Sequence, residues 1–303
     1  MSISPLSKPT PLALPNLTAF LADDLLGECP HWDEERGILS RVDVHGGLLR
    51  CCDPATGEQS TVTLEAPISF AIPRTSGGYV FGIGLQVILL DADGTKRSLV
   101  DLSAQRPDNR LNDAVCDAQG RLWVGTMSSM RPRAAGAAAL YRIDPDGGYE
   151  EVLTDLTLSN GMDWPDDGAT LLHIDSDAHR IDRHEVDVQH GRLGRRSCFA
   201  ELDPADGLPD GLTIDAEGGV WVAFFGGSEI RRYDAQGGEV ARLRLPVSCP
   251  ASVAFGGADL GDLFITTSRH RLTEAETAQQ PLAGSLLRLR PGVKGRIGYR
   301  FAG

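Results

Sequence analysis

Short strand-forming runs recur along the whole chain at a period of about 45 residues. Each run is rich in β-branched or apolar residues, and each is followed by a second strand that ends in a turn of Asp and Gly. A strand-only repeat of this length is typical of one blade of a β-propeller. The starts of the runs are separated by about 41, 43, 49, 49 and 43 residues. The six runs are Ile38–Val44, Tyr79–Gly84, Leu122–Thr126, Leu171–Asp175, Val220–Ala223 and Leu263–Thr267.

The periodicity of the chain favours strands over helices throughout. A helical period is not sustained beyond a turn or two, and the longest helix-like stretch is Leu272–Gln280. Six β-units in one chain can close radially, which leaves no long unpaired sheet edge. We therefore predict an all-β fold, a six-bladed β-propeller that residues 1–303 form as a single domain, with residues 1–16 as an extended N-terminal arm. The alternative is a two-domain β-sandwich, whose turns usually recur every 8–12 residues without a longer period.

Charge and hydropathy exclude several classes of protein. The 303 residues are 41% hydrophobic, which excludes a disordered chain. With 29 basic and 42 acidic residues the net charge is −13, and such a surface repels phosphate backbones and anionic lipids, so we expect no nucleic-acid or membrane partner. No run approaches the roughly 18 apolar residues of a membrane span. The Pro-interrupted N-terminus lacks the apolar core of a signal peptide, so we expect a cytoplasmic protein. A monomer and a weak homo-oligomer both stay open.

Polar residues stand ten or eleven positions before each of the six runs. In a propeller, equivalent positions on the innermost strands face each other across the central channel. A ring of carboxylate and amide oxygens at one mouth of that channel suits one divalent cation, Ca²⁺ first, with Mg²⁺, Mn²⁺ or Zn²⁺ as alternatives. The opposing interpretation is that these groups only complete strand ends or bind water. The positions are Glu28, Ser69, Asn112, Asn160, Asp210 and Ser252.

Several longer motifs make the chain recognisable. They are LLGECPHWDEERG (25–37), NRLNDAVCDAQGRLWVGTM (109–127), LSNGMDW (158–164), LPDGLTIDAEGGVWVA (208–223) and AGSLLRL (283–289). With these motifs the chain resembles the regucalcin/gluconolactonase family of six-bladed propellers over essentially its whole length. The resemblance implies hydrolysis of a sugar lactone with one divalent cation, held by Glu28, Asn160 and Asp210. It also implies substrate contacts from Arg110 and Asn112, with Asp113 beside them.

The chain departs from the family pattern at two places. Family members often carry a glutamate shortly after the Gly-Thr-Met triplet, whereas residues 128–139 here contain no carboxylate and offer Arg131 and Arg133. We hypothesise that Arg131 or Arg133 pairs with a second carboxylate on the lactone, as in an aldarate or uronate type; the alternative is a solvated basic loop. Cys29 follows Glu28 where a small residue such as Gly is more usual. Its thiol either contacts the metal or is buried and unreactive.

The expected reaction assigns two roles to Asp210, metal ligand and general base toward the attacking water. Arg110 and Asn112 would orient the ring hydroxyls. Two other functions stay open from the sequence: an organophosphate or aryl-ester hydrolase that uses the same site, and a calcium- or metabolite-binding regulatory propeller without catalysis.

Overall fold

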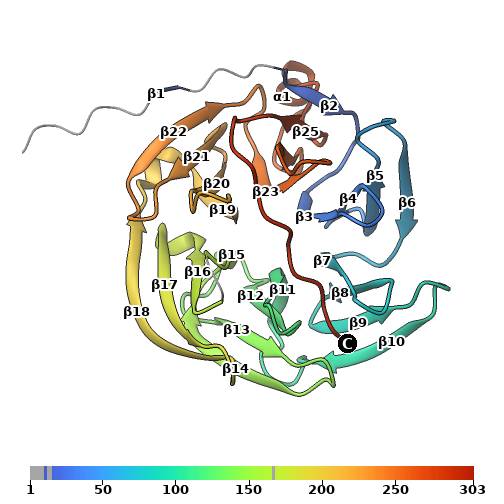
Figure 1. Ribbon diagram of the computed structural model, residues 1–303, viewed down its shortest axis with the longest axis vertical. Helices are drawn as coiled ribbons and strands as arrows, with labels where there is room; N and C mark the ends of the chain where they lie inside the picture. Colours follow the sequence, from blue (N-terminus) through green and yellow to red (C-terminus); the bar gives the residue numbers. More distant parts are fainter. Residues whose placement is uncertain (1–9, 12–15, 166–167) are drawn as a thin grey trace, which may run out of the picture.

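The computed structural model describes residues 10–11, 16–165 and 168–303. Among these residues, the strands form six radially arranged sheets around a central axis, five with four strands and one with five (Figure 1). The six-bladed all-β propeller is therefore confirmed, and the two-domain sandwich is wrong. That residues 1–303 form one domain stays a prediction. The predicted N-terminal arm, residues 1–16, lies mostly outside the described residues.

Each blade is a meander of antiparallel strands that runs from the axis outward. The innermost strands are β3 (Gly27–Asp33), β7 (Ile68–Pro73), β11 (Asn109–Cys116), β15 (Ser159–Asp163), β19 (Leu208–Ile214) and β23 (Pro250–Gly256). The second strands are β4 (Ile38–Asp43), β8 (Tyr79–Ile83), β12 (Leu122–Ser128), β16 (Thr170–Asp175), β20 (Val220–Phe225) and β24 (Asp262–Thr267). These second strands coincide with the six runs that the sequence predicted.

The third and fourth strands complete each blade on its outer side, and short helices lie in the connections between strands or blades. The third strands are β5 (Leu48–Cys52), β9 (Gln86–Leu90), β13 (Ala138–Ile143), β17 (Arg180–Asp187), β21 (Glu229–Tyr233) and β25 (Leu286–Leu289). We number the blades in chain order, so that blade 1 begins with β3 and blade 6 with β23. The outer strands of blades 1 to 5 are β6 (Gln59–Thr63), β10 (Lys96–Asp101), β14 (Tyr149–Leu156), β18 (Arg192–Glu201) and β22 (Glu239–Arg244). The helices are the 3₁₀ turns η1 (Ser176–Ala178) and η2 (Pro204–Asp206) and the single-turn α1 (Glu274–Gln279). No helix among the described residues has both the length and the apolar character needed to cross a bilayer.

The ring is closed by a strand from the N-terminal part of the chain. Blade 6 takes β23, β24 and β25 from the C-terminal part, and β2 (Thr18–Phe20) adds its outer strand (Figure 1). Thr18 pairs with Arg288 and Phe20 with Leu286, in antiparallel register. A further short strand, β1 (Thr10–Pro11), pairs in parallel with β22 at the outside of blade 5. Both additions cover strand edges that would otherwise stay unpaired.

Large aromatic side chains join neighbouring blades near the axis. Trp123 of blade 3 and Trp164, which follows β15 of blade 4, meet edge to face with ring centroids 5.3 Å apart. Trp221 of blade 5 meets Phe255 of blade 6 in the same way at 6.0 Å. The three tryptophans are fully buried. Such contacts fix the spacing of the blades and therefore the width of the channel.

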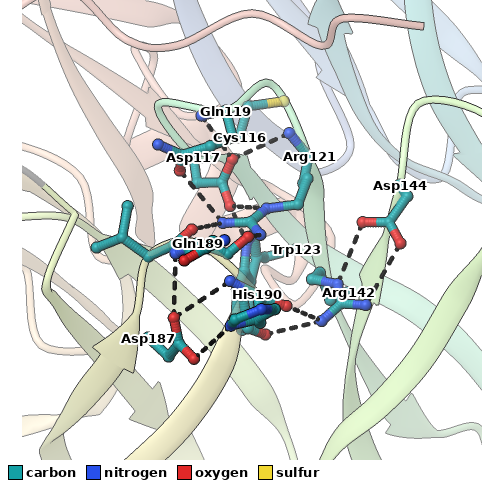
Figure 2. Close-up of polar contacts among 12 residues, drawn as sticks. Cys116, Asp117, Gln119, Arg121, Trp123, Arg142, Asp144, Asp187, Gln189 and His190 are labelled. Atoms are coloured by element: carbon teal, nitrogen blue, oxygen red, sulfur yellow. Dashed lines mark hydrogen bonds and ion pairs between the residues drawn. The ribbon is translucent and has the colours of Figure 1, made fainter.

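A hydrogen-bonded cluster links blade 3 to blade 4 at the turn between β11 and β12 (Figure 2). Asp117 accepts from the indole Nε1 of Trp123 at 2.9 Å and from Arg121 Nε at 2.6 Å. Arg121 Nη2 reaches the carbonyl of Val188 at 2.8 Å, and Arg142 Nη1 reaches that of His190 at 2.7 Å. Because every charge has a partner, this cluster is structural.

The C-terminal residues 294–303, here called the tail, cross one end of the channel (Figure 1). Arg296 Nη1 donates to Pro165 O of blade 4 at 2.9 Å, and Arg300 Nη2 pairs with Asp33 of blade 1 at 2.8 Å. The tail backbone reaches the other four blades through hydrogen bonds between Lys294 O and Ala216 N (2.8 Å), Gly295 N and Leu260 O (2.8 Å), Phe301 N and Pro73 O (3.1 Å), and Ala302 N and Gly120 O (3.0 Å). The tail thus contacts all six blades where their innermost strands end, and we call this the tail end.

Candidate functional site

Every innermost strand carries a β-bulge near its beginning. In blade 4, Ser159 pairs with Asp175 and Met162 pairs with His173. The chain therefore advances three residues on β15 but only two on β16 between these pairs. The same irregularity occurs after Glu28, Ile68, Leu111, Pro209 and Pro250. A bulge turns side chains out of the sheet's normal alternation. The six bulges gather at the end of the channel opposite the tail, which we call the site mouth.

Glycines next to two predicted ligands let the innermost strands approach each other closely. A Cβ on Gly161, which follows Asn160, would lie 2.5 Å from the carbonyl oxygen of Asp210. A Cβ on Gly211, which follows Asp210, would lie 2.1 Å from Ser252 Oγ. Both contacts are far too short for a side chain. The Asn-Gly and Asp-Gly pairs therefore allow strands of blades 4, 5 and 6 to converge at the site mouth.

The bulge register corrects the predicted ring of polar positions at two of its six members. Ser69, Asn112, Asn160 and Asp210 each stand one residue after the last regular pair of their strand. In blade 1 that place belongs to Cys29, one residue after Glu28. In blade 6 it belongs to Ala251, one residue before Ser252. Counting back from the second strands misses this, because the bulge position lies nine residues before β4 and eleven before β24, but ten before the second strand of every other blade.

Cys29 has a backbone φ of 46°, in the left-handed region that glycine adopts without strain. This explains why a small residue such as Gly is usual there. The Cys29 side chain is buried, and burial raises the pKa of its thiol well above the ordinary value. In the metal-free protein this thiol is therefore buried and protonated.

The charges of Glu28, Asp113 and Asp210 act on one another at the site mouth, although no group of three His, Cys, Asp or Glu side chains among the described residues is arranged to hold a metal ion. Asn160 Nδ2 donates to Asp210 Oδ1 at 2.5 Å and to Ser176 Oγ at 3.0 Å. Burial and the charge of Asp113 raise the pKa of Asp210 to about 8. Burial, followed by the charges of Asp210 and Asp113, raises the pKa of Glu28 well above its ordinary value. Burial raises the pKa of Asp113 to about 6. Without a cation, these groups do not all ionise together near neutral pH.

Arg110 and Asn112 border the three carboxyl groups. Arg110 Nη1 donates to Leu111 O at 2.7 Å; burial lowers the pKa of its guanidinium to about 10, although the charges of Glu28 and Asp210 oppose that shift. Asn112 Nδ2 donates to the carbonyl of Ser159 at 3.0 Å and so ties blade 3 to the residue before Asn160. The structure therefore brings the substrate residues predicted on β11 to the same mouth as the predicted ligands.

The two arginines that follow the Gly-Thr-Met triplet differ in their surroundings. Arg133 forms an ion pair with Asp177, with Nε and Oδ2 2.7 Å apart. Arg131 is exposed, and its one hydrogen bond among the described residues runs from Nη1 to the backbone oxygen of Met130, at 3.1 Å. Of the two, Arg131 is the one with a free guanidinium face.

Residues 26–269 match the family described as SMP-30/gluconolactonase/LRE-like region. The chain belongs to this family. Among curated members, it is 34% identical to regucalcin of Xenopus laevis over 284 residues, which is 92% of this chain and 95% of that protein. It is 32% identical to regucalcin of Homo sapiens over 283 residues, which is 91% of this chain and 95% of that protein. The resemblance that the motifs indicated is thereby confirmed.

Solved structures of the family superpose closely on this chain. A luciferin-regenerating enzyme is 27% identical with a TM-score of 0.87, over 95% of this chain and 99% of the other. A calcium-binding protein, regucalcin from Agrobacterium tumefaciens, is also 27% identical with a TM-score of 0.87, over 93% and 95%. A gluconolactonase from Xanthomonas campestris, 22% identical with a TM-score of 0.74 over 90% and 89%, shares the fold.

The structure adds three residues at the site mouth that the sequence did not indicate. His45 follows β4, and His270 and Arg271 follow β24; both segments connect a second strand to a third strand at the same end as the bulges. The imidazole rings of His45 and His270 lie 4.1 Å apart, which brings blades 1 and 6 together. Neither histidine belongs to a recognisable motif, so only the closed ring shows that they are neighbours.

Ser159 and His173 form a second polar pair, and it is structural. Ser159 Oγ lies 2.8 Å from His173 Nε2, but both residues are fully buried. No substrate reaches this serine.

Proposed function

We propose that this protein hydrolyses a sugar lactone with the help of one divalent cation held by Glu28, Asn160 and Asp210. The observation that supports the proposal is that Glu28, Asp113 and Asp210 share one mouth with pKa values raised by burial and mutual repulsion, while none of them has an ion-pair partner within 4.0 Å among the described residues. A divalent cation offsets that repulsion, and carboxylate and amide oxygens are the donors that Ca²⁺ prefers, while Mg²⁺, Mn²⁺ and Zn²⁺ accept them too. A related structure is described as calcium-binding, and another as a gluconolactonase.

The reaction is the addition of water to the acyl carbon of the lactone. The new C–O bond forms, the bond from the acyl carbon to the ring oxygen breaks, and the products are a carboxylic acid and a free hydroxyl. When bound, the cation supplies Lewis-acid polarisation of the carbonyl and stabilisation of the oxyanion. Asp210 takes the proton from the attacking water and returns it to the departing ring oxygen.

The residues of β11 bind and orient the substrate in this proposal. Arg110 is held against the backbone by its bond to Leu111 O, so its guanidinium is preorganised toward the carboxyl groups. Asn112 and Asp113 lie on the bulge of the same strand, within reach of ring hydroxyls. Fixed positions for these groups lower the entropy cost of reaching the transition state.

The first test is lactone opening measured by pH-stat after removal of metal with a chelator. We expect turnover that disappears with chelator and returns with a divalent cation. Calcium binding measured by calorimetry should be lost in Glu28→Gln and retained in Glu35→Gln, a matched change of an exposed glutamate at the tail end. Absence of turnover on every aldono- and aldarolactone, with each of the four cations, would contradict the proposal.

The same assays separate the two alternative functions. Phosphotriester or aryl-ester turnover without lactone turnover would indicate the second hydrolase class. Tight calcium binding without turnover of any ester would indicate a regulatory binding protein. This alternative is supported by a related structure that is described as a calcium-binding protein.

A further inference from the structure

Three arginines at the site mouth have no carboxylate partner. Among the described residues, no carboxylate oxygen lies within 4.0 Å of the guanidinium of Arg110, Arg131 or Arg271, whereas Arg133 beside them is paired with Asp177. The chain carries 42 acidic against 29 basic residues, and most of its other arginines form ion pairs. A gathering of unpaired guanidinium groups at one opening of an acidic protein therefore calls for an anionic ligand.

The strand register places Arg271 above the site mouth. The guanidinium carbon of Arg271 lies 5.6 Å from the ring centre of Phe225. Phe225 pairs with Leu208, two residues before Asp210 on β19. The charge of Arg271 is also among those that act on Asp210. Arg271 thus lies beside blade 5 although it belongs to blade 6. We call the loops around the site mouth that carry His45, Arg131, His270 and Arg271 the rim.

The loop that carries Arg271 is fixed to blade 1 and not freely extended. The backbone N–H groups of Arg269 and His270 both donate to the carbonyl of Leu25, at 3.1 and 2.9 Å, and Ser268 Oγ donates to the same oxygen at 2.7 Å. Leu25 lies just before β3, which carries Glu28. The rim is therefore held in place relative to the predicted ligands.

Arg131 reaches the rim from the other side. It lies in the segment after β12, where Met127 pairs with Arg110. The charge of Arg131 acts on Arg110, on His45 and on His270. Burial, together with these positive neighbours, lowers the pKa of His45 to about 4, so this imidazole is neutral at pH 7. The histidine pair offers hydrogen bonds to hydroxyls, while the arginines supply the positive charge.

We propose that the substrate is a lactone with a second carboxylate, remote from the reacting carbonyl, and that Arg131 and Arg271 bind this carboxylate at the rim. The chemical class is a monolactone of a dicarboxylic sugar acid or a lactone of a uronic acid. This inference rests on the proposed lactone hydrolysis. Guanidinium groups form charge-assisted hydrogen bonds with carboxylates, and the donor set at the rim contains guanidinium and imidazole groups.

The test compares two substrates that differ only in the remote group, a neutral aldonolactone and the matching aldarolactone. We expect kcat/KM to be about tenfold or more higher for the aldarolactone, from one or two charge-assisted contacts. Arg271→Gln and Arg131→Gln should each reduce that preference about tenfold or more, and Arg271→Lys should restore part of it. Arg195→Gln, which changes an exposed arginine on β18, is the control and should leave the preference unchanged.

Binding gives a readout that does not depend on turnover. The open-chain dicarboxylate should bind more tightly than the monocarboxylate in calorimetry, and added salt should weaken only that difference. Equal kcat/KM for the two lactones, or a preference that survives both substitutions, would overturn the inference while leaving lactone hydrolysis intact. A stronger preference for a phosphorylated lactone would also overturn it, since the anion would then be a phosphate. Absence of turnover on all lactones would instead contradict the proposed function.

Discussion

Asp210 and Asp215 lie five residues apart, at the two ends of one channel-lining segment, and their surroundings differ. Asp215 accepts from Gly219 N at 2.7 Å, Trp221 Nε1 at 2.8 Å and Arg232 Nε at 2.7 Å. Burial favours the neutral form of Asp215, but these hydrogen bonds outweigh it and lower its pKa. Asp210 accepts from Asn160, and its pKa is raised to about 8.

The comparison distinguishes a carboxylate that completes a turn, Asp215, from Asp210, which we propose binds a cation. At the tail end, Asp215 accepts from Gly219 in its own turn and from Trp221 and Arg232 on the next two strands. At the site mouth, Asp210 has the amide of Asn160 but no ion-pair partner among the described residues, and the charge of Asp113 opposes its ionisation, which is typical of a site that binds a ligand. Four predictions test this difference.

The largest effect is expected for Asp210→Ala. We expect lactone turnover to fall by about 10³-fold or more, because a general base and a cation ligand are lost together. The unfolding free energy of the metal-free protein should stay the same or rise, since one of three repelling carboxyl groups is removed. Urea unfolding and pH-stat kinetics on the same preparation measure both. Turnover near that of the original protein at saturating cation would remove Asp210 from the mechanism.

Asp215→Ala should show the opposite pattern. It leaves Arg232 and the indole N–H of Trp221 without their partner, and removal of one member of a buried ion pair costs about 3–5 kcal/mol of unfolding free energy. Asp234→Ala, in the next turn of the same blade, is the matched control. Asp234 accepts only backbone N–H groups, from Gln236 and Gly238, so its loss should cost about 1 kcal/mol. Equal losses of unfolding free energy in Asp215→Ala and Asp234→Ala would contradict the structural role of Asp215.

Asp210 should also make the unfolding free energy of the metal-free protein depend on pH. The folded, metal-free protein holds the Asp210 proton up to about pH 8, whereas the unfolded chain loses it near the ordinary pKa of 3.8. Over this range Asp210 holds its proton more in the folded than in the unfolded state, so its contribution to the unfolding free energy should fall as pH rises, by at most about 1.4 kcal/mol per pH unit. Urea unfolding in chelator between these limits measures the slope. The slope should shrink in Asp210→Asn and on addition of a divalent cation.

The smallest effect is expected at the tail. Arg300→Gln removes the ion pair between the tail and Asp33 of blade 1, which is mostly shielded from solvent. We expect a loss of about 1 kcal/mol in unfolding free energy and no change in lactone turnover. A change in kcat or KM larger than the error of the assay would show that the tail end influences the site mouth.

The sequence predicted the fold well because its signals are local. Alternating strands and Asp-Gly turns determine where β4, β8 and the other second strands begin, and the repeat length leaves little choice of architecture. It did not predict that β2 completes blade 6, or that the tail covers the channel. Both features depend on residues that are far apart in the chain and meet only when the ring closes.

The candidate site was predicted in part for the same reason. Glu28, Asn160 and Asp210 stand in motifs, and the structure brings Asn160 and Asp210 into direct contact. Glu28 and Ser252 each stand one residue from the bulge position of their strand, because the number of residues between that position and the second strand differs in blades 1 and 6. His45, His270 and Arg271 lie in connecting loops, and only the three-dimensional arrangement shows that they share the rim.

The pairing of β2 with β25 has a consequence for how the molecule is made. Thr18 is synthesised early and Arg288 late, yet the two are partners in one sheet. During translation the propeller ring stays open, because β25, the strand of blade 6 that pairs with β2, is synthesised last. Completion of the native state therefore waits for a contact that spans nearly the whole polypeptide, and such contacts make folding slow. Until β2 and β25 pair, the incomplete ring exposes strand edges, and exposed edges promote aggregation.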